Sequence, residues 1–276
     1  MKVIMYLICI STFTLVMAIL ILLFSGTERK ENVVLEFNIT GGIWGRNDGF
    51  KLYSNGSATY RVRKEIVRTL TLPVQVLEEL DSRVKQLRRS YPDGLKLEPS
   101  DGADYFIYSL AVHSDEKIIS YQWTSFNKVP NELFYLTDLL HGVNGFLANP
   151  ESIIVYIRAG SLNVSKGYVL ELHVFAFNPA QEDFMYDSPT PCHPDFKVLL
   201  YRDRDEPVEL FPAGYDSSVP CIQVVQQRRL KANETLYAEY RITLNEEGTY
   251  IIEASFPYSE WSQRRFTSRI MVTVKG

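Results

Sequence analysis

The longest apolar segment of the chain lies at its start. No charged side chain occurs in residues 3–24. A helix that rises about 1.5 Å per residue over this run is long enough to cross the hydrocarbon core of a bilayer. The run exceeds the apolar core of a typical cleaved signal peptide, and its exit at 23–26 places a bulky residue three positions before any cut. The pattern predicts an uncleaved signal anchor over residues 1–26, with a cleaved signal or lipidation at Cys9 as the alternatives.

The charges beside this segment indicate its orientation. Lys2 is the flanking charge before it, whereas the two acidic and two basic side chains of residues 28–31 cancel after it. Cytoplasmic flanks carry an excess of Lys and Arg, so the N-terminus is expected inside and the rest of the chain outside the membrane. If the segment is cleaved, the protein is secreted.

Residues 31–141 contain segments of period two and segments of helical period. The alternating segments, which predict strands, are 33–39, 50–53, 58–62, 104–112 and 117–123. Asn55-Gly56 is a strong hairpin signal between two of them. Apolar residues recur at helical spacing after Pro73 and again after Pro130. Strands interrupted and followed by helices predict an α+β domain with an antiparallel sheet covered by helices on one face.

Glycines, asparagines and a proline in residues 142–150 predict a linker between two domains. Short strands without helical period follow it, and the predicted ones are 153–159, 169–177, 196–201, 221–225, 235–242, 248–254 and 268–274. This spacing is typical of an antiparallel β-sandwich. The fold class is therefore multi-domain: a transmembrane helix at 1–26, an α+β domain at 31–141, a linker at 142–150 and an all-β sandwich at 151–276.

Composition, cysteines and sequons indicate the compartment of the protein and the class of partner that it can bind. The chain is 46% apolar and 22% charged with a net charge of −4, which fits packed domains and disfavours nucleic acid as a partner. Cys192 and Cys221 are the cysteines outside the apolar run, and outside the membrane a disulfide between them is expected, with two buried free thiols as the alternative. Four glycosylation sequons also occur, and their acceptors are Asn38, Asn55, Asn163 and Asn233.

Catalytic motifs are missing from the sequence. It contains no His-Glu-x-x-His, Gly-x-Ser-x-Gly, phosphate-binding glycine loop or Cys-x-x-Cys. The histidines lack metal-ligand spacing and are His113, His141, His173 and His193. We therefore expect a protein that is not an enzyme and has no catalytic residue, cofactor or metal site.

Two segments resemble known families. The turn Gly41-Gly42-Ile43-Trp44-Gly45, the helix after Leu72-Pro73, the run at 102–110 and the helix after Pro130 resemble emfourin, a family of small proteins that inhibit thermolysin-like metalloproteases. Asn178-Pro179, Pro194-Asp195-Phe196, residues 233–236 and Glu247-Gly248-Thr249-Tyr250 resemble the intracellular proteinase inhibitor family of bacilli, BsuPI. The second resemblance implies an immunoglobulin-like sandwich and binding of a subtilisin-type serine protease.

The predicted anchor and the two resemblances together predict a membrane-anchored extracytoplasmic protein that binds and inhibits metallo- or serine-type proteases through its two domains. The alternative is a cell-surface interaction or adhesion module without inhibitory activity. Exposed loop tips would make the contact, and the candidates are Ile43, Trp44 and Asn47. For Trp44 a place in the core, where it caps the sheet, is the favoured competing expectation. Tyr250 is expected to pack at a corner of the sandwich.

Overall fold

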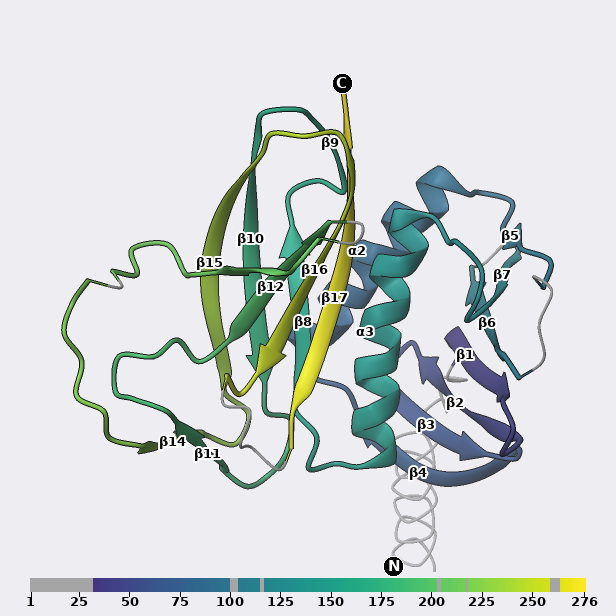
Figure 1. Ribbon diagram of the computed structural model, residues 1–276. Helices are drawn as coiled ribbons and strands as arrows, with labels where there is room; N and C mark the ends of the chain where they lie inside the picture. The colour runs from purple at the N-terminus through teal and green to yellow at the C-terminus, as the bar shows by residue number, and fades with distance from the viewer. Residues whose placement is uncertain (1–31, 100–103, 115–116, 203–204, 217, 259–263) are drawn as a thin grey trace, which may run out of the picture. The chain divides into compact units, whose positions relative to one another are not determined.

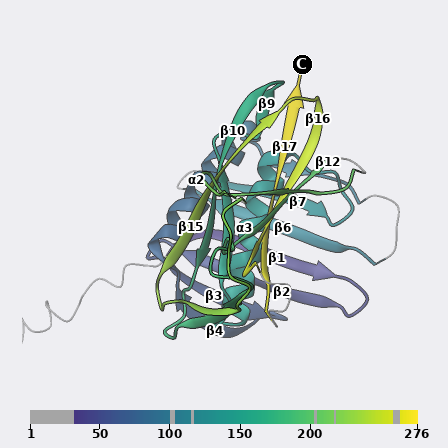
Figure 2. The same ribbon diagram turned by 60° about the vertical axis from the view of Figure 1, so that its left-hand side comes forward.

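The alternation of side chains along β1 (Val33–Gly41) decides which face of the first sheet is buried. Leu35, Phe37 and Ile39 point into the core. β1 lies in the middle of seven strands, whose order is β4-β3-β2-β1-β6-β7-β5. The other strands are β2 (Arg46–Tyr53), β3 (Ser57–Val62), β4 (Glu65–Thr71), β5 (Leu95–Lys96), β6 (Phe106–His113) and β7 (Ile118–Thr124). Figure 2 shows β2, β1, β6 and β7 side by side.

Two helices pack on the buried face of this sheet. α2 (Val74–Ser90) begins after Pro73, and α3 (Asn131–Ala148) begins after Pro130, as the sequence predicts. Leu80 of α2 and Leu136 of α3 belong to the same core cluster as Phe37. The Asn55-Gly56 hairpin is also confirmed, because Gly56 N donates to Tyr53 O at 2.9 Å.

The predicted linker at 142–150 is wrong for most of its length. Residues 142–148 form the last two turns of α3, and only the residues after Ala148 leave the helix. Val143, Phe146 and Leu147 of this segment are buried. Burial of their apolar side chains outweighs the weak helix propensity of Gly142 and Gly145.

The C-terminal half consists of strands in two facing sheets and a two-stranded ribbon. One sheet has the order β15-β10-β8 and the other β13-β12-β16-β17-β9. Their inward side chains, among them Leu172, Val174, Ile252 and Val272, form a second core cluster. The strands are β8 (Ile154–Ala159), β9 (Asn163–Ser165), β10 (Tyr168–Phe177), β11 (Phe184–Ser188), β12 (Lys197–Arg202), β13 (Val208–Leu210), β14 (Gln226–Leu230), β15 (Thr235–Leu244), β16 (Gly248–Phe256) and β17 (Phe266–Lys275).

One strand predicted for this half does not form. Residues 221–225 are irregular, and the strand β14, which pairs with β11, begins only at Gln226. The side chains of Ile222, Val224 and Val225 are all exposed there. Without a sheet face to cover, these apolar residues gain nothing from strand pairing.

A buried polar network joins the helices to the sandwich. Arg83 on α2 is 1% exposed, and its Nη2 donates to Ile157 O of β8 at 2.8 Å. Its Nε donates to Glu79 Oε1 at 2.8 Å, and Arg158 of β8 donates to the other carboxylate oxygen at 2.7 Å. At the start of α3, Asn131 Nδ2 donates to Leu162 O at 2.9 Å. Figure 1 shows α3 running beside β17, with the seven-stranded sheet on its other side.

The computed structural model describes residues 32–99, 104–114, 117–202, 205–216, 218–258 and 264–276. Residues 33–276 cluster as one compact unit. Within the described ranges no helix is long and apolar enough to span a membrane. The predicted anchor at 1–26 lies outside the described residues.

Candidate functional site

A tight turn joins β1 to β2 at one end of the seven-stranded sheet. Gly45 N donates to Gly42 O at 2.9 Å, which closes the four-residue turn 42–45. Gly42 and Gly45 have φ angles of +73° and +59°, and Gly41 has +100°. A Cβ atom at Gly41 would lie 2.4 Å from Tyr105 O. The glycines of this turn are therefore required by backbone conformation and close approach.

The two apolar residues at the tip of this turn project into solvent. Trp44 is 93% exposed and Ile43 is 75% exposed. The expectation that Trp44 caps the sheet from within the core is therefore wrong. The core positions of the hairpin are the alternating residues of β1 and β2, and the turn extends beyond them.

Asn47, the third predicted contact residue, lies on β2 beside the turn. It is exposed, and its carbonyl oxygen accepts a hydrogen bond from Arg63 N at 2.8 Å. The structure thus brings Ile43, Trp44 and Asn47 to the same end of the sheet.

A buried carboxylate anchors the base of the hairpin to α3. Asp48 is 8% exposed and accepts hydrogen bonds from Arg46 Nη2 at 3.0 Å, from Asn144 Nδ2 at 2.8 Å and from Tyr60 OH at 3.3 Å. Burial opposes ionisation of Asp48, but the hydrogen bonds from Arg46 and Asn144 outweigh it and lower its pKa. The ionised Asp48 therefore holds the start of β2 in a fixed position on the helix.

Two features that the sequence did not reveal border the turn. The β3–β4 loop consists of Arg63 and Lys64, both exposed, with φ angles of +50° and +75°. On the other side Tyr105 contacts Phe126, whose side chain is 56% exposed. The sequence analysis did not predict the strand β4. The β-branched residues of 65–71 were the available signal for this strand, and hence for the loop before it. The tip is thus an apolar projection with two cations on one side and an aromatic pair on the other.

The predicted disulfide is confirmed, since the sulfurs of Cys192 and Cys221 are bonded and their Cα atoms lie 6.1 Å apart. It links the segment after β11 to the loop before β14. The four sequon acceptors lie in three different settings. Asn55 and Asn233 are exposed in turns, Asn163 is exposed on the short strand β9, and Asn38 is half-buried on the central strand β1.

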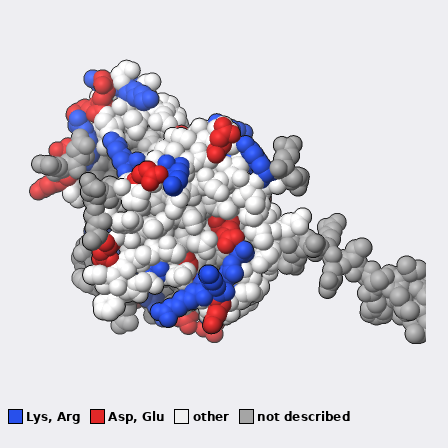
Figure 3. Space-filling view, turned by 90° about the vertical axis from the view of Figure 1, so that its right-hand side faces the viewer, with Lys and Arg blue, Asp and Glu red and all other residues white. Residues whose placement is uncertain are grey.

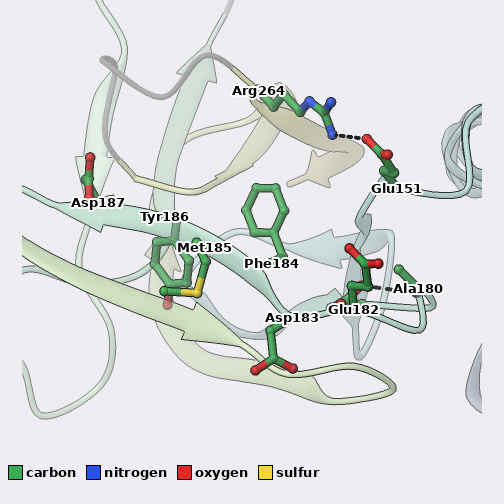
Figure 4. Close-up of a pocket in the computed structure, with 10 residues that line it drawn as sticks. Glu151, Ala180, Glu182, Asp183, Phe184, Met185, Tyr186, Asp187 and Arg264 are labelled. Atoms are coloured by element: carbon green, nitrogen blue, oxygen red, sulfur yellow. Dashed lines mark hydrogen bonds and ion pairs between the residues drawn. The ribbon is translucent and has the colours of Figure 1, made fainter.

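A separate hollow of about 630 Å³ lies beside β11 and contains no assembled reactive group. Figure 4 shows the carboxylates of Glu151, Glu182, Asp183 and Asp187 spread around it, not gathered at one point. Arg264 forms an ion pair with Glu151 at 2.7 Å. Across the described part of the chain no group of three or more His, Cys, Asp or Glu is placed to hold a metal ion.

Charge on the face shown in Figure 3 is mixed, since basic and acidic groups lie next to each other between large uncharged areas. On the sheet itself, Glu36 of β1 pairs with Lys51 at 2.8 Å and with Arg61 at 3.7 Å. Burial opposes ionisation of Glu36, but these cations keep its pKa below the ordinary value. Such paired charges are typical of a solvated sheet face.

No protein-family model and no curated protein matches the chain. Among solved structures, the CARDB domain of PF1109 from Pyrococcus furiosus, in complex with di-metal ions, matches 45% of this chain and 92% of its own length, at 16% identity and a TM-score of 0.27. The β-glucosidase EmGH1 from Erythrobacter marinus matches at 12% identity and a TM-score of 0.28, over 45% of this chain and 15% of its own. PapD-like domain 7 of human CEP192 matches at 14% identity and a TM-score of 0.22, over 44% of this chain and 84% of its own. These scores are too low to assign a shared fold or a function.

Proposed function

We propose that this chain is a membrane-anchored extracytoplasmic protein without catalytic activity that binds and inhibits proteases. The observation that carries the proposal is the tip of the β1–β2 hairpin, where Trp44 is 93% and Ile43 is 75% exposed. A fully exposed tryptophan contributes nothing to the core, whereas in a protein interface tryptophan is among the residues with the largest binding energies.

The hairpin has the rigidity that such a contact needs. The turn closes through its own backbone hydrogen bond, and the Asp48 network fixes the hairpin on α3. A side chain that is held in place before binding loses less conformational entropy on binding. A rigid apolar projection therefore favours insertion into a concave site on a partner.

Compartment and finer fold belong to the same proposal. A disulfide between Cys192 and Cys221 is typical of oxidising compartments outside the cytoplasm, which agrees with an anchor at 1–26 and the soluble part outside. We also assign residues 151–276 to an immunoglobulin-like sandwich. In support, Tyr250 OH donates to Glu246 O at 3.0 Å, as the corner tyrosine of such sandwiches does.

The test uses the compact unit, residues 33–276, and measures hydrolysis by a thermolysin-like and a subtilisin-like protease as the fragment is titrated. We expect slower hydrolysis by at least one of them at micromolar concentration. Trp44→Ala is expected to weaken binding by about 2 kcal/mol, roughly 30-fold in Ki. Its effect on the free energy of unfolding should stay within about 0.5 kcal/mol because the side chain is exposed.

The matched control is Tyr237→Ala, which removes an aromatic side chain that is 61% exposed on β15 of the sandwich. This variant should inhibit as the unaltered fragment does. If the folded fragment slows neither protease, inhibition of these classes is refuted. Binding of a protease without slower hydrolysis would instead support the alternative, an interaction module without inhibitory activity.

A further inference from the structure

The loop between β13 and β14 carries a second exposed apolar segment. Its residues 218–225 form neither helix nor strand, and the loop stands out from the sandwich strands at the left of Figure 1. Val219, Ile222, Val224 and Val225 are between 53% and 67% exposed. Burial of one such side chain is worth about 1.5–3 kcal/mol. The loop therefore leaves unused a driving force that a partner could use.

Two clamps, one within the loop and one just after it on β14, tie it to the segment 190–195. Cys221 is bonded to Cys192. On β14, Arg228 donates to Pro191 O at 2.6 Å, to His193 O at 3.1 Å and to Asp195 Oδ1 at 2.6 Å. The clamps reduce the conformational freedom that residues 221–228 would lose on binding.

The clamps are themselves held by the sandwich. Tyr186 OH of β11 donates to Asp195 Oδ1 at 2.7 Å, and Tyr258 N donates to Asp195 O at 2.8 Å. The base of the loop is thus supported by β11 and by the segment after β16, and the exposed apolar side chains are presented from a fixed platform.

The chemistry of the loop identifies the kind of partner surface. Residues 218–227 contain no charged side chain. For 218–225 the described backbone hydrogen bonds within the main chain are those from Val219 N to Asp216 O and from Val224 N to Ile222 O. A narrow, protruding and uncharged segment outside any strand ladder fits a concave apolar cleft whose edge pairs with an extended backbone.

We propose that residues 218–225 enter the substrate cleft of an endoprotease with apolar specificity pockets. Ile222 is the anchoring side chain, since it follows the disulfide directly and at 67% is the most exposed aliphatic residue of the loop. The proposal rests on the proposed function and adds to it a second contact element, separate from the β1–β2 hairpin.

The experiment measures the Ki of the fragment 33–276 for a subtilisin-like protease, with a trypsin-like protease as the specificity control. We expect inhibition of the first and none of the second, because residues 218–227 lack Lys and Arg. Ile222→Glu should raise the Ki at least about 30-fold, the effect of losing one buried interface anchor. The matched control is Ile66→Glu on β4, where the isoleucine is 64% exposed, and it should change the Ki less than twofold.

A second measurement uses the double variant Cys192→Ser/Cys221→Ser. Without the clamp at Cys221, we expect the subtilisin-like protease to cut the chain faster within 218–225. The masses of the cleavage products identify the site of the cut. An unchanged Ki for Ile222→Glu, together with a loss of inhibition for Trp44→Ala, overturns the loop proposal and leaves the proposed function standing. If the folded fragment inhibits neither a thermolysin-like nor a subtilisin-like protease, the loop proposal and the proposed function are both overturned.

Discussion

Arg83 offers the sharpest test of how the fold is held together. Its side chain is 1% exposed, and its guanidinium carbon lies 3.6 Å from the centre of the Tyr135 ring. Its nitrogens donate to Glu79, to Tyr135 O and to Ile157 O, so one side chain links α2, α3 and β8. Substitution Arg83→Met keeps much of the apolar stem and removes every one of these donors.

The size of the expected loss in the free energy of unfolding follows from the buried groups that Arg83→Met leaves behind. Glu79 is 3% exposed and would retain a hydrogen bond from Tyr135 OH at 3.2 Å and the ion pair with Arg158 at 2.7 Å. Burial opposes ionisation of Glu79, yet Arg83 and Arg158 together lower its pKa. Removal of one partner of a buried ion pair typically costs about 3–5 kcal/mol. We expect a loss of that size in the free energy of unfolding.

The assay is urea unfolding of residues 33–276, followed by far-UV circular dichroism and by tryptophan fluorescence. Lys85→Met is the matched control on the same helix, since Lys85 and its partner Asp81 are 62% and 59% exposed, and it should cost less than about 0.5 kcal/mol. The double variant Glu79→Leu/Arg83→Met removes both buried charges and should be more stable than Arg83→Met alone. A cost below about 1 kcal/mol for Arg83→Met, or strict additivity in the double variant, would refute this reasoning.

Three further predictions concern other parts of the molecule. Cys192→Ser with Cys221→Ser opens a loop with a sequence separation of 29 and should cost about 3–4 kcal/mol in chemical unfolding. Burial is the main cause that lowers the pKa of His141 to about 4, and the charge of Arg46 is the second. The neutral His141 therefore contributes to folding stability above pH 6.5, and this contribution is lost as the pH falls toward 4. His141→Gln should therefore remove up to about 3 kcal/mol of acid sensitivity, measured as unfolding at pH 7 and 4.5, and an unchanged pH profile contradicts this. Arg63→Asn with Lys64→Gly relieves two positive φ angles and should raise the melting temperature, with a gain in stability of about 1 kcal/mol, and a less stable variant contradicts it.

Local patterns sufficed for the elements whose own residues specify them. Pro73 and Pro130 fix where α2 and α3 begin, because proline suits the start of a helix. Asn55-Gly56 fixes the β2–β3 turn, since glycine adopts the positive φ that it needs. The pairing of Cys192 with Cys221 was also accessible, since they are the cysteines outside the apolar run at the start of the chain.

The end of α3 could not be predicted from local pattern. Gly142 and Gly145 disfavour a helix locally, but Val143, Phe146 and Leu147 fit a core to which strands distant in the sequence contribute. The exposure of Trp44 was equally hidden, because an aromatic residue after a strand fits the core as well as a turn tip. Each of these outcomes depends on the neighbours that the fold supplies.

The sequence by itself thus determined an uncharged apolar segment at 3–24, two helix starts, a β-rich C-terminal half and a cysteine pair. Tertiary structure decided which apolar side chains are buried and which are offered to a partner. Ile43, Trp44 and Ile222 have the same chemistry as core residues, and only the turn and the clamped loop that carry them keep them in solvent. The physical reason is that hydrophobic burial depends on the surfaces that meet in space, and local sequence does not specify those surfaces.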